Sequence, residues 1–118
     1  MPEDLAPHEM ALAELVWAHA PIGSGELVKL ADQELDWKKS TTYTVLRKLC
    51  EKGLFCNENS MVSVLVTKDE YVVGRSRQFI DDNFGGSLPL FIATFMGRGH
   101  LNDDQVAELR HLIDEYEE

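Results

Sequence analysis

The stretch from residue 37 to residue 54, WKKSTTYTVLRKLCEKGL, gathers positive charge and hydroxyl groups in an otherwise acidic chain. Its five lysines and arginines against one glutamate give it a formal charge of +4, whereas the whole chain carries −10 at pH 7. Ammonium, guanidinium and hydroxyl groups are the ones that proteins use on DNA phosphates and base edges. The stretch is therefore a candidate DNA-binding segment.

Helical spacing divides these side chains between two faces. Residues at i, i+3, i+4 and i+7 form the more apolar face: Thr42, Val45, Leu46 and Leu49. The polar face carries Ser40, Tyr43, Thr44 and Arg47. We expect a helix from about Ser40 to Lys52, ended by Gly53, with one face packed on a domain and the other in a DNA groove.

The predicted DNA contacts are of two kinds. For base edges we expect Thr41, Tyr43, Thr44 and Arg47, of which arginine can form two hydrogen bonds with guanine. Phosphate contacts are assigned to the cations Lys38, Lys39, Lys48 and Lys52. Ser40 adds a hydroxyl group to the set. On composition alone, a solvated helix face would explain the same residues.

The flanking sequence predicts the elements that position this helix. Two helices precede it, over 8–20 and 25–33, the second with Ser24 as its N-cap. After Gly53 the pattern alternates, so 54–57 and 60–66 are predicted strands joined at Glu58-Asn59. Three helices followed by a β-hairpin is the layout of a winged helix-turn-helix, whose third helix enters the major groove.

Three more helices are expected after the hairpin. Capping boxes at 67–70 and 102–105 begin the first and the last, and Gly85-Gly86 separates the first from a short apolar helix. Three thin helices cannot enclose a core of their own, so their apolar side chains are expected to form a dimer interface. The residues assigned to it are Phe79, Phe84, Leu88, Phe91, Ile92, Phe95, Val106, Leu109 and Ile113.

The predicted fold class is thus mainly α with a small β-hairpin, in two regions. A winged helix-turn-helix DNA-binding domain is expected over 1–66 and a three-helix dimerisation region over 67–118. A chain of 118 residues buries only a modest core by itself, which also favours a homodimer. Both regions are acidic, at −4 and −6 by count, so DNA binding must rest on the local basic stretch.

The sequence does not support other site chemistries. Cys50 and Cys56 match no zinc spacing and are expected to be reduced thiols, and the four histidines show no ligand spacing. We therefore expect no metal, no cofactor, no small-molecule substrate and no enzyme activity. The first ten residues lack a signal-peptide pattern, and no apolar run approaches the ~20 residues of a membrane span, so a cytoplasmic location is expected.

An ordered set of residues extends over nearly the whole chain. It comprises Glu9, Leu12 and Leu15-Val16-Trp17; Glu26-Leu27-Val28; Trp37, Thr41, Thr44, Leu46 and Lys48-Leu49; Lys52-Gly53-Leu54; Leu65-Val66 and Glu70-Tyr71; and Gly86-Ser87-Leu88 with Phe95. In this order the chain resembles the penicillinase-repressor family of winged-helix transcriptional regulators, the BlaI/MecI type with its copper-responsive relatives. The resemblance implies a dimeric repressor that binds a palindromic operator in double-stranded DNA through the third helix until a signal releases it.

The chain departs from the family's pattern at several places. Several members are inactivated by proteolysis between Asn and Phe in the short tail helix, which implies a membrane-linked sensor protease as a partner. The equivalent bond here is Thr94–Phe95, with threonine in place of asparagine. Lys38 stands where members often carry a capping serine, and the hairpin lacks a glycine followed by a cation. The cysteine pair that the copper-responsive relatives carry near the tail end has no counterpart in the tail here.

Two alternatives from other classes of protein stay open. The acidic total charge and the shortened hairpin favour a winged-helix protein-interaction module without specific DNA binding. A small hydrolase or metal-binding protein is the second alternative. A stripe of positive charge along the third helix of the folded chain would favour DNA over a protein partner.

Overall fold

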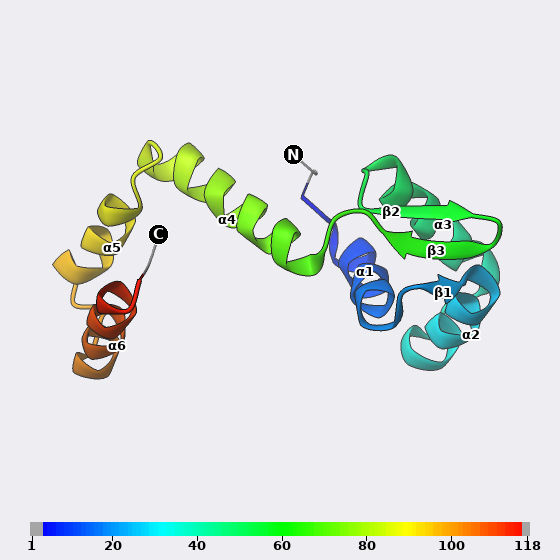
Figure 1. Cartoon of the computed structure of the whole chain (residues 1–118), viewed down its shortest axis with the longest axis horizontal. Coiled ribbons are helices and arrows are strands. Elements are labelled where there is room, and N and C mark those ends of the chain that lie inside the picture. Colours follow the sequence, from blue (N-terminus) through cyan, green and yellow to red (C-terminus); the bar gives the residue numbers. More distant parts are fainter. Residues whose placement is uncertain (1–3, 117–118) are drawn as a thin grey trace. The chain divides into compact units, whose positions relative to one another are not determined.

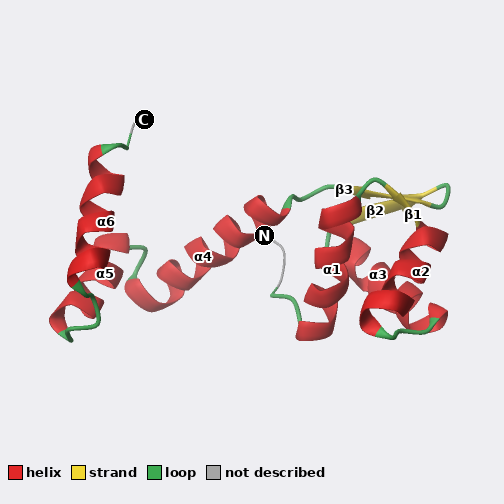
Figure 2. Cartoon of the chain, turned by 90° about the horizontal axis from the view of Figure 1, so that it is seen from below, coloured by secondary structure: helices red, strands yellow, loops and turns green. Residues whose placement is uncertain are grey.

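The computed structural model describes residues 4–116, which form six helices and three short strands (Figure 1). In chain order these are α1 (Pro7–His19), β1 (Ile22–Gly23), α2 (Ser24–Leu35), α3 (Lys39–Glu51), β2 (Phe55–Glu58), β3 (Met61–Val64), α4 (Lys68–Phe84), α5 (Leu88–Gly97) and α6 (Asp103–Asp114). Helices dominate, and the strands form one small sheet (Figure 2). The predicted class, a winged helix-turn-helix followed by three helices, is confirmed.

Packing divides the chain inside α4. The first unit ends at Ser76 and the second begins at Arg77. The assignment of 1–66 to DNA binding and of 67–118 to dimerisation concerns function and stays a prediction. Within residues 4–116, no helix is long and apolar enough to cross a membrane.

The sheet contains one strand more than the sequence predicted. β3 lies between β1 and β2 and is antiparallel to both, with Ile22 opposite Val62 and Phe55 opposite Val64. The sequence predicted no strand at β1, because two residues are too short to show an alternating pattern. β1 directly precedes α2 and pairs with β3 of the hairpin. The pairing therefore links the beginning of α2 to the sheet.

The hairpin turn lies one residue later than predicted. Asn59 and Ser60 have φ values of 52° and 61°, the left-handed backbone that a two-residue type I′ turn requires at both positions. The turn is therefore Asn59-Ser60 and not Glu58-Asn59. β2 keeps the predicted length of four residues but begins one residue later than the predicted 54–57, and β3 covers only 61–64 of the predicted 60–66. Leu54 lies outside the strand and accepts backbone hydrogen bonds from Leu65 and Val66 at its carbonyl.

The first unit has one core, to which all three leading helices and the sheet contribute. The buried apolar residues are Leu5, Leu12, Ala13, Val16, Ile22, Leu27, Ala31, Val45, Leu46, Leu49, Leu54, Phe55, Val62 and Tyr71. Burying one leucine or phenylalanine completely contributes about 1.5–3 kcal/mol relative to leaving it in water. The apolar face of α3 therefore supplies a large share of the packing that holds this unit together.

Trp17 and Tyr71 connect this core to the beginning of α4. The indole N–H of Trp17 donates to the Val66 carbonyl at 2.9 Å, and its ring lies 5.8 Å from that of Tyr71. The Tyr71 hydroxyl in turn accepts a hydrogen bond from the Leu5 N–H at 3.1 Å. The capping box at Thr67 and Glu70 also forms as predicted, with bonds of 2.9 and 3.1 Å. The start of α4 thus belongs to the first unit.

A buried ion pair joins the beginning of α1 to the end of α3. Lys52 Nζ lies 2.8 Å from Glu9 Oε1, and Glu9 is 4% exposed. The same carboxylate oxygen accepts a hydrogen bond from the Ala6 N–H at 2.8 Å, which caps α1. The bond from Lys52, followed by that from Ala6, holds the pKa of Glu9 below its ordinary value of 4.5. Lys52, which the sequence assigned to phosphate, is thus engaged inside the fold.

The second unit consists of the rest of α4 with α5 and α6. Its start signals are as predicted, since Ser87 caps α5 through a bond from Leu90 N at 3.1 Å and Asn102 caps α6 with Gln105. Phe91 lies at the centre of an aromatic cluster, 5.9 Å from Phe79, 5.2 Å from Phe84 and 5.0 Å from Phe95 between ring centroids. No described residue of α5 or α6 is fully buried.

We expect Glu9→Gln to lower the free energy of unfolding at pH 7 by about 1–3 kcal/mol, because it removes a charge-assisted hydrogen bond from a buried site. The folded-state pKa of Glu9 is lowered, so its contribution is present above pH 4.5 and is lost as the pH falls through that pKa. Denaturant unfolding at several pH values should therefore show the two proteins converging in acid.

Glu14→Gln is the matched control, because Glu14 pairs with Lys68 at the same 2.8 Å but with side chains that are 45% and 53% exposed. An exposed pair contributes about 0–1 kcal/mol, so this variant should unfold almost like the wild type. Equal losses for both variants at every pH would contradict the role given to Glu9.

Candidate nucleic-acid interface

A short turn connects α2 to the candidate recognition helix α3. Asp36 takes a left-handed conformation, with φ 57° and ψ 40°, at the position where glycine most often ends a helix. Its N–H donates to Asp32 O at 3.1 Å, which is the bond of the αL motif, and the Trp37 N–H donates to Ala31 O at 3.3 Å. α3 then begins at Lys39, so the two helices and their turn form a helix-turn-helix.

The amino terminus of α3 has no side-chain cap. Lys38 is the N-cap residue, in extended conformation, and its side chain forms no cap hydrogen bond. The first turn contains no acid, so the positive end of the helix dipole coincides with Lys38 and Lys39, both exposed. The sequence predicted that the helix begins near Ser40, one residue later than it does. Such an end repels cations and favours an anion.

The predicted apolar face of α3 is buried. Val45, Leu46 and Leu49 are at most 5% exposed, and Thr42 is fully buried, its hydroxyl donating to the Lys38 carbonyl at 3.1 Å. That bond satisfies the one polar group on this face. The helix is therefore fixed by its back, and its opposite side meets solvent.

The exposed side of α3 carries most of the predicted site residues. Those in solvent are Lys38, Lys39, Ser40, Thr41, Thr44, Arg47 and Lys48. The Thr44 hydroxyl donates to the Ser40 carbonyl at 2.9 Å, which leaves its oxygen free to accept a hydrogen bond. The structure thus brings seven of the eight predicted DNA-binding residues onto one exposed surface.

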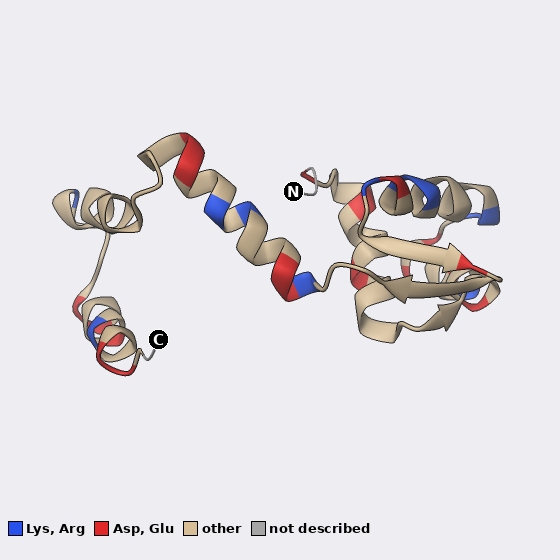
Figure 3. Cartoon of the chain, turned by 45° about the horizontal axis from the view of Figure 1, so that its top comes forward, with Lys and Arg blue, Asp and Glu red and all other residues tan. Residues whose placement is uncertain are grey.

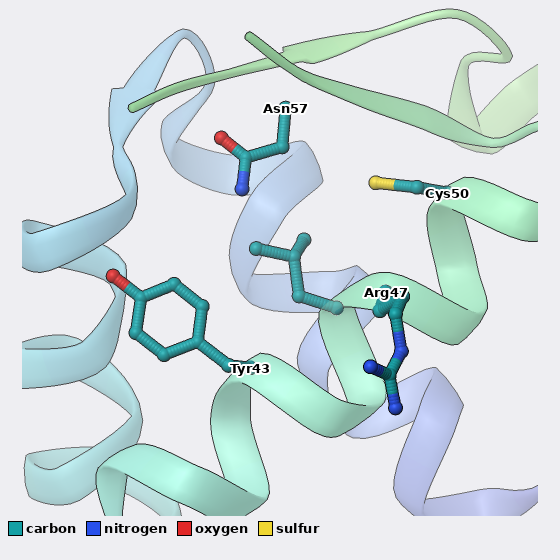
Figure 4. A pocket seen from close by; sticks show the side chains of 5 residues that line it. Tyr43, Arg47, Cys50 and Asn57 are labelled. Carbon is teal, nitrogen blue, oxygen red and sulfur yellow. The ribbon is translucent and has the colours of Figure 1, made fainter. Parts of the chain in front are cut away.

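Tyr43 is placed differently from the sequence expectation. It is half-buried and packs against the core, and its hydroxyl points toward α2 in Figure 4. This hydroxyl donates to Ser24 Oγ of α2 at 3.2 Å. Ser24 was expected to cap α2, but Gly23 is the N-cap residue and the Ser24 side chain is buried. The Tyr43 ring therefore joins α3 to α2, and part of it stays exposed beside Arg47.

Four cations of the exposed side lack acidic partners. Lys38, Lys39, Arg47 and Lys48 form no ion pair with any of residues 4–116. Lys52, by contrast, pairs with Glu9. Figure 3 shows basic positions along α3, in a unit whose other elements carry mostly acidic ones. The positive charge of the first unit is thus concentrated at α3 and its leading turn.

The hairpin beside α3 offers no positive charge. Residues 54–66 contain Glu58 but no lysine or arginine. The two-residue turn makes the hairpin short, and Asn57, Glu58, Asn59, Ser60 and Met61 around its tip are all exposed. Contact with DNA through this wing would have to use neutral hydrogen bonds or apolar contact.

A hollow of about 390 Å³ lies between α3 and β2, and no sequence pattern predicted it. It is lined by Tyr43, Leu46, Arg47, Cys50 and Asn57. In Figure 4 the Asn57 amide and the Cys50 thiol point into it, while the Arg47 guanidinium extends from its rim, away from Asn57. Burial raises the pKa of Cys50, and desolvation likewise raises that of Cys56, so both free thiols stay protonated near neutral pH.

Two further residues support the site in a way that the sequence did not predict. Ser24 receives the Tyr43 hydroxyl from 19 positions away, and Glu9 receives Lys52 from 43 positions away. No local pattern encodes such pairs. The one usable signal was Glu9 itself, because a single acid among the inward positions of α1 requires a partner.

The predicted dimerisation residues divide by exposure. Phe79, Leu88, Phe95 and Ile113 are 50%, 57%, 41% and 71% exposed. Half-buried are Phe84, Phe91, Ile92, Val106 and Leu109. Further apolar side chains of the same unit are exposed as well: Leu90, Met96, Leu112 and Tyr116. The second unit therefore leaves much apolar surface in water, as a segment that binds a partner does.

The predicted cleavage bond, Thr94–Phe95, lies inside α5. The Thr94 hydroxyl donates to the Leu90 carbonyl at 2.9 Å, and the Phe95 ring contacts the Phe91 ring at a tilt of 53°. Both residues are exposed, but the backbone is helical rather than extended. A protease would have to unwind this helix locally to bind the bond.

No group of three or more potential metal ligands occurs in the part of the chain that the structure describes. Of the four histidines, His100 meets Phe95 edge to face, with ring centroids 6.3 Å apart, and all four are exposed. The acids Asp103 and Asp104 lie in the first turn of α6, where they complement the helix dipole.

Comparison with known proteins agrees with this architecture. A family model described as "Penicillinase repressor" matches residues 5–115. The penicillinase repressor of Bacillus licheniformis is 23% identical over 112 residues, which cover 92% of this chain and 88% of that protein. The methicillin resistance regulatory proteins MecI of Mammaliicoccus sciuri and of Staphylococcus aureus strain N315 are each 19% identical, over 93% of both chains. The chain therefore belongs to the penicillinase repressor family of transcriptional repressors.

Proposed function

We propose that the chain is a dimeric repressor that binds a palindromic DNA operator, with α3 of each protomer in the major groove. Repression of transcription comes from the family, and the helix-turn-helix supports the mode of binding. The observation that carries the proposal is the set of four exposed cations of α3 without ion pairs among residues 4–116. In a chain of charge −10, such a local set of cations favours an anionic partner.

The cations and hydroxyls take different roles in this proposal. Lys38, Lys39 and Lys48 bind phosphates, with Ser40 as a further donor. Thr41, Thr44 and Arg47 contact base edges. Because Ser24 holds the Tyr43 hydroxyl, we assign to Tyr43 an apolar contact through the exposed part of its ring.

Titration of the purified chain against the DNA upstream of its own gene tests the proposal. Fluorescence anisotropy should give at least about 10³-fold tighter binding than to a scrambled duplex of equal length at physiological salt. Equal affinity for the two duplexes would refute operator binding.

Replacing Arg47 by alanine should weaken binding to the operator by about 1–3 kcal/mol, because a two-hydrogen-bond contact with a base is lost. Binding to scrambled DNA should change far less. Arg47→Lys is the matched control: it keeps the charge but not the planar fork, so specificity should fall here too. If Arg47→Ala lowers both affinities equally, Arg47 does not contact a base.

Replacing Lys39 by alanine should act on every sequence alike. One phosphate contact fewer lowers the slope of log affinity against log salt concentration by about 1. Lys29→Ala, an equal loss of charge on the exposed side of α2, is the control and should leave the slope within error. The same change of slope in both variants would indicate a general charge effect instead.

The dimer is proposed from the apolar surface of the second unit. Ile113 of α6 is 71% exposed, so Ile113→Lys should not disturb the fold of one chain but should place a charge in the interface. Sedimentation velocity should show dimers for the wild type and monomers for this variant at equal concentration. Met61→Lys, at a 47% exposed apolar position of the hairpin, is the control. A monomeric wild type would exclude the dimer.

A protein-interaction module is the second candidate function. It is favoured by the charge of −10 and by a hairpin without cations. It predicts that a basic protein binds the first unit while operator and scrambled DNA bind equally weakly. A signal that releases the repressor, by cleavage at Thr94–Phe95 or by other means, is likewise proposed from the resemblance to the family.

A further inference from the structure

Asn57 is a polar residue at a position of β2 where packing on the core would favour an apolar one. Side chains alternate between the two faces of a strand, so Asn57 lies on the same face as Phe55, two residues earlier. Phe55 is 1% exposed and part of the core, and Val62, which pairs with Asn57 in the register, is fully buried. An apolar residue would be expected on this face. Asn57 is instead exposed, with its amide directed into the hollow beside α3 (Figure 4).

The Asn57 amide has hydrogen-bonding capacity that the fold leaves unused. Its side chain forms no hydrogen bond with any of residues 4–116. An asparagine side chain offers two N–H donors and an accepting oxygen. The hollow that it faces is bounded on the other side by the half-buried Tyr43 and the exposed Arg47 of α3. A ligand held by α3 would therefore pass within reach of Asn57.

We propose that Asn57 binds a phosphate of the DNA backbone that lies in this hollow while α3 occupies the major groove; this rests on the proposed function. The backbone strands form the walls of the major groove, so one strand would run along the flank of α3 that borders the hollow. On that side the hairpin has no cation, and Asn57 is the polar side chain that lines the hollow from β2. Asn57 thus fixes the register of α3 by a neutral hydrogen bond, without adding electrostatic affinity.

The test uses the full chain and three variants with two duplexes, the operator recovered by selection and a scrambled sequence of equal length. A neutral phosphate contact predicts that Asn57→Ala weakens binding to both duplexes by the same factor, about fivefold for one hydrogen bond, with the salt slope unchanged. Asn57→Lys would place a cation against the phosphate, so it should tighten binding and raise the salt slope by about 1. Asn59→Gly is the control, because it removes an amide from the same hairpin and tolerates the φ of 52°.

Several outcomes would overturn the assignment of Asn57. Wild-type affinity in Asn57→Ala, a loss confined to the operator, or an unchanged salt slope in Asn57→Lys would each do so, provided that thermal unfolding shows all variants folded. A wild type that binds both duplexes equally contradicts operator recognition but leaves the Asn57 contact measurable on either duplex. A wild type that binds neither duplex refutes both.

Discussion

The burial of the back of α3 is the constraint on which the rest of the first unit depends. Thr42, Val45, Leu46 and Leu49 can leave water because α1, α2 and the sheet close around them. That packing fixes the rotation of the helix about its own axis, and the rotation decides which side chains meet solvent. Three tethers then fix its position: the turn at Asp36 at its beginning, the bond from Tyr43 to Ser24 in its middle, and the pair of Lys52 with Glu9 at its end.

This arrangement explains how an acidic chain can carry a DNA-binding surface. Electrostatic steering would repel the chain from DNA at long range, because its total charge is −10. At contact, however, screening limits each interaction to about 8–10 Å at moderate salt, so the local charge of α3 matters more than the total. Lys52 and Glu9 neutralise each other inside the fold, which leaves Lys38, Lys39, Arg47 and Lys48 as the exposed cations of this segment. Affinity should therefore be modest and strongly dependent on salt.

Much of the fold could be predicted because local patterns encode it. The 3.6-residue spacing identified the buried face of α3, and the capping boxes at 67–70 and 102–105 located two helix starts. Seven of the eight predicted DNA-binding residues lie on one exposed surface for the same reason. Local patterns do not predict which residues far apart in the chain contact each other. The Tyr43 hydroxyl donates to Ser24, Lys52 pairs with Glu9, and a strand of two residues pairs with the hairpin. None of these contacts produces a periodic pattern in the sequence.

Selection from a random duplex library with the purified full-length chain tests the central claim most directly. At about 0.15 M salt, the bound DNA should converge on a palindrome whose half-sites lie about one helical turn, or a whole number of turns, apart, because two copies of α3 related by a two-fold axis would contact them. Enrichment of a single, non-repeated half-site would argue against the dimer alone. Bound DNA with the same sequence distribution as the input library would contradict the account of α3 as a recognition helix.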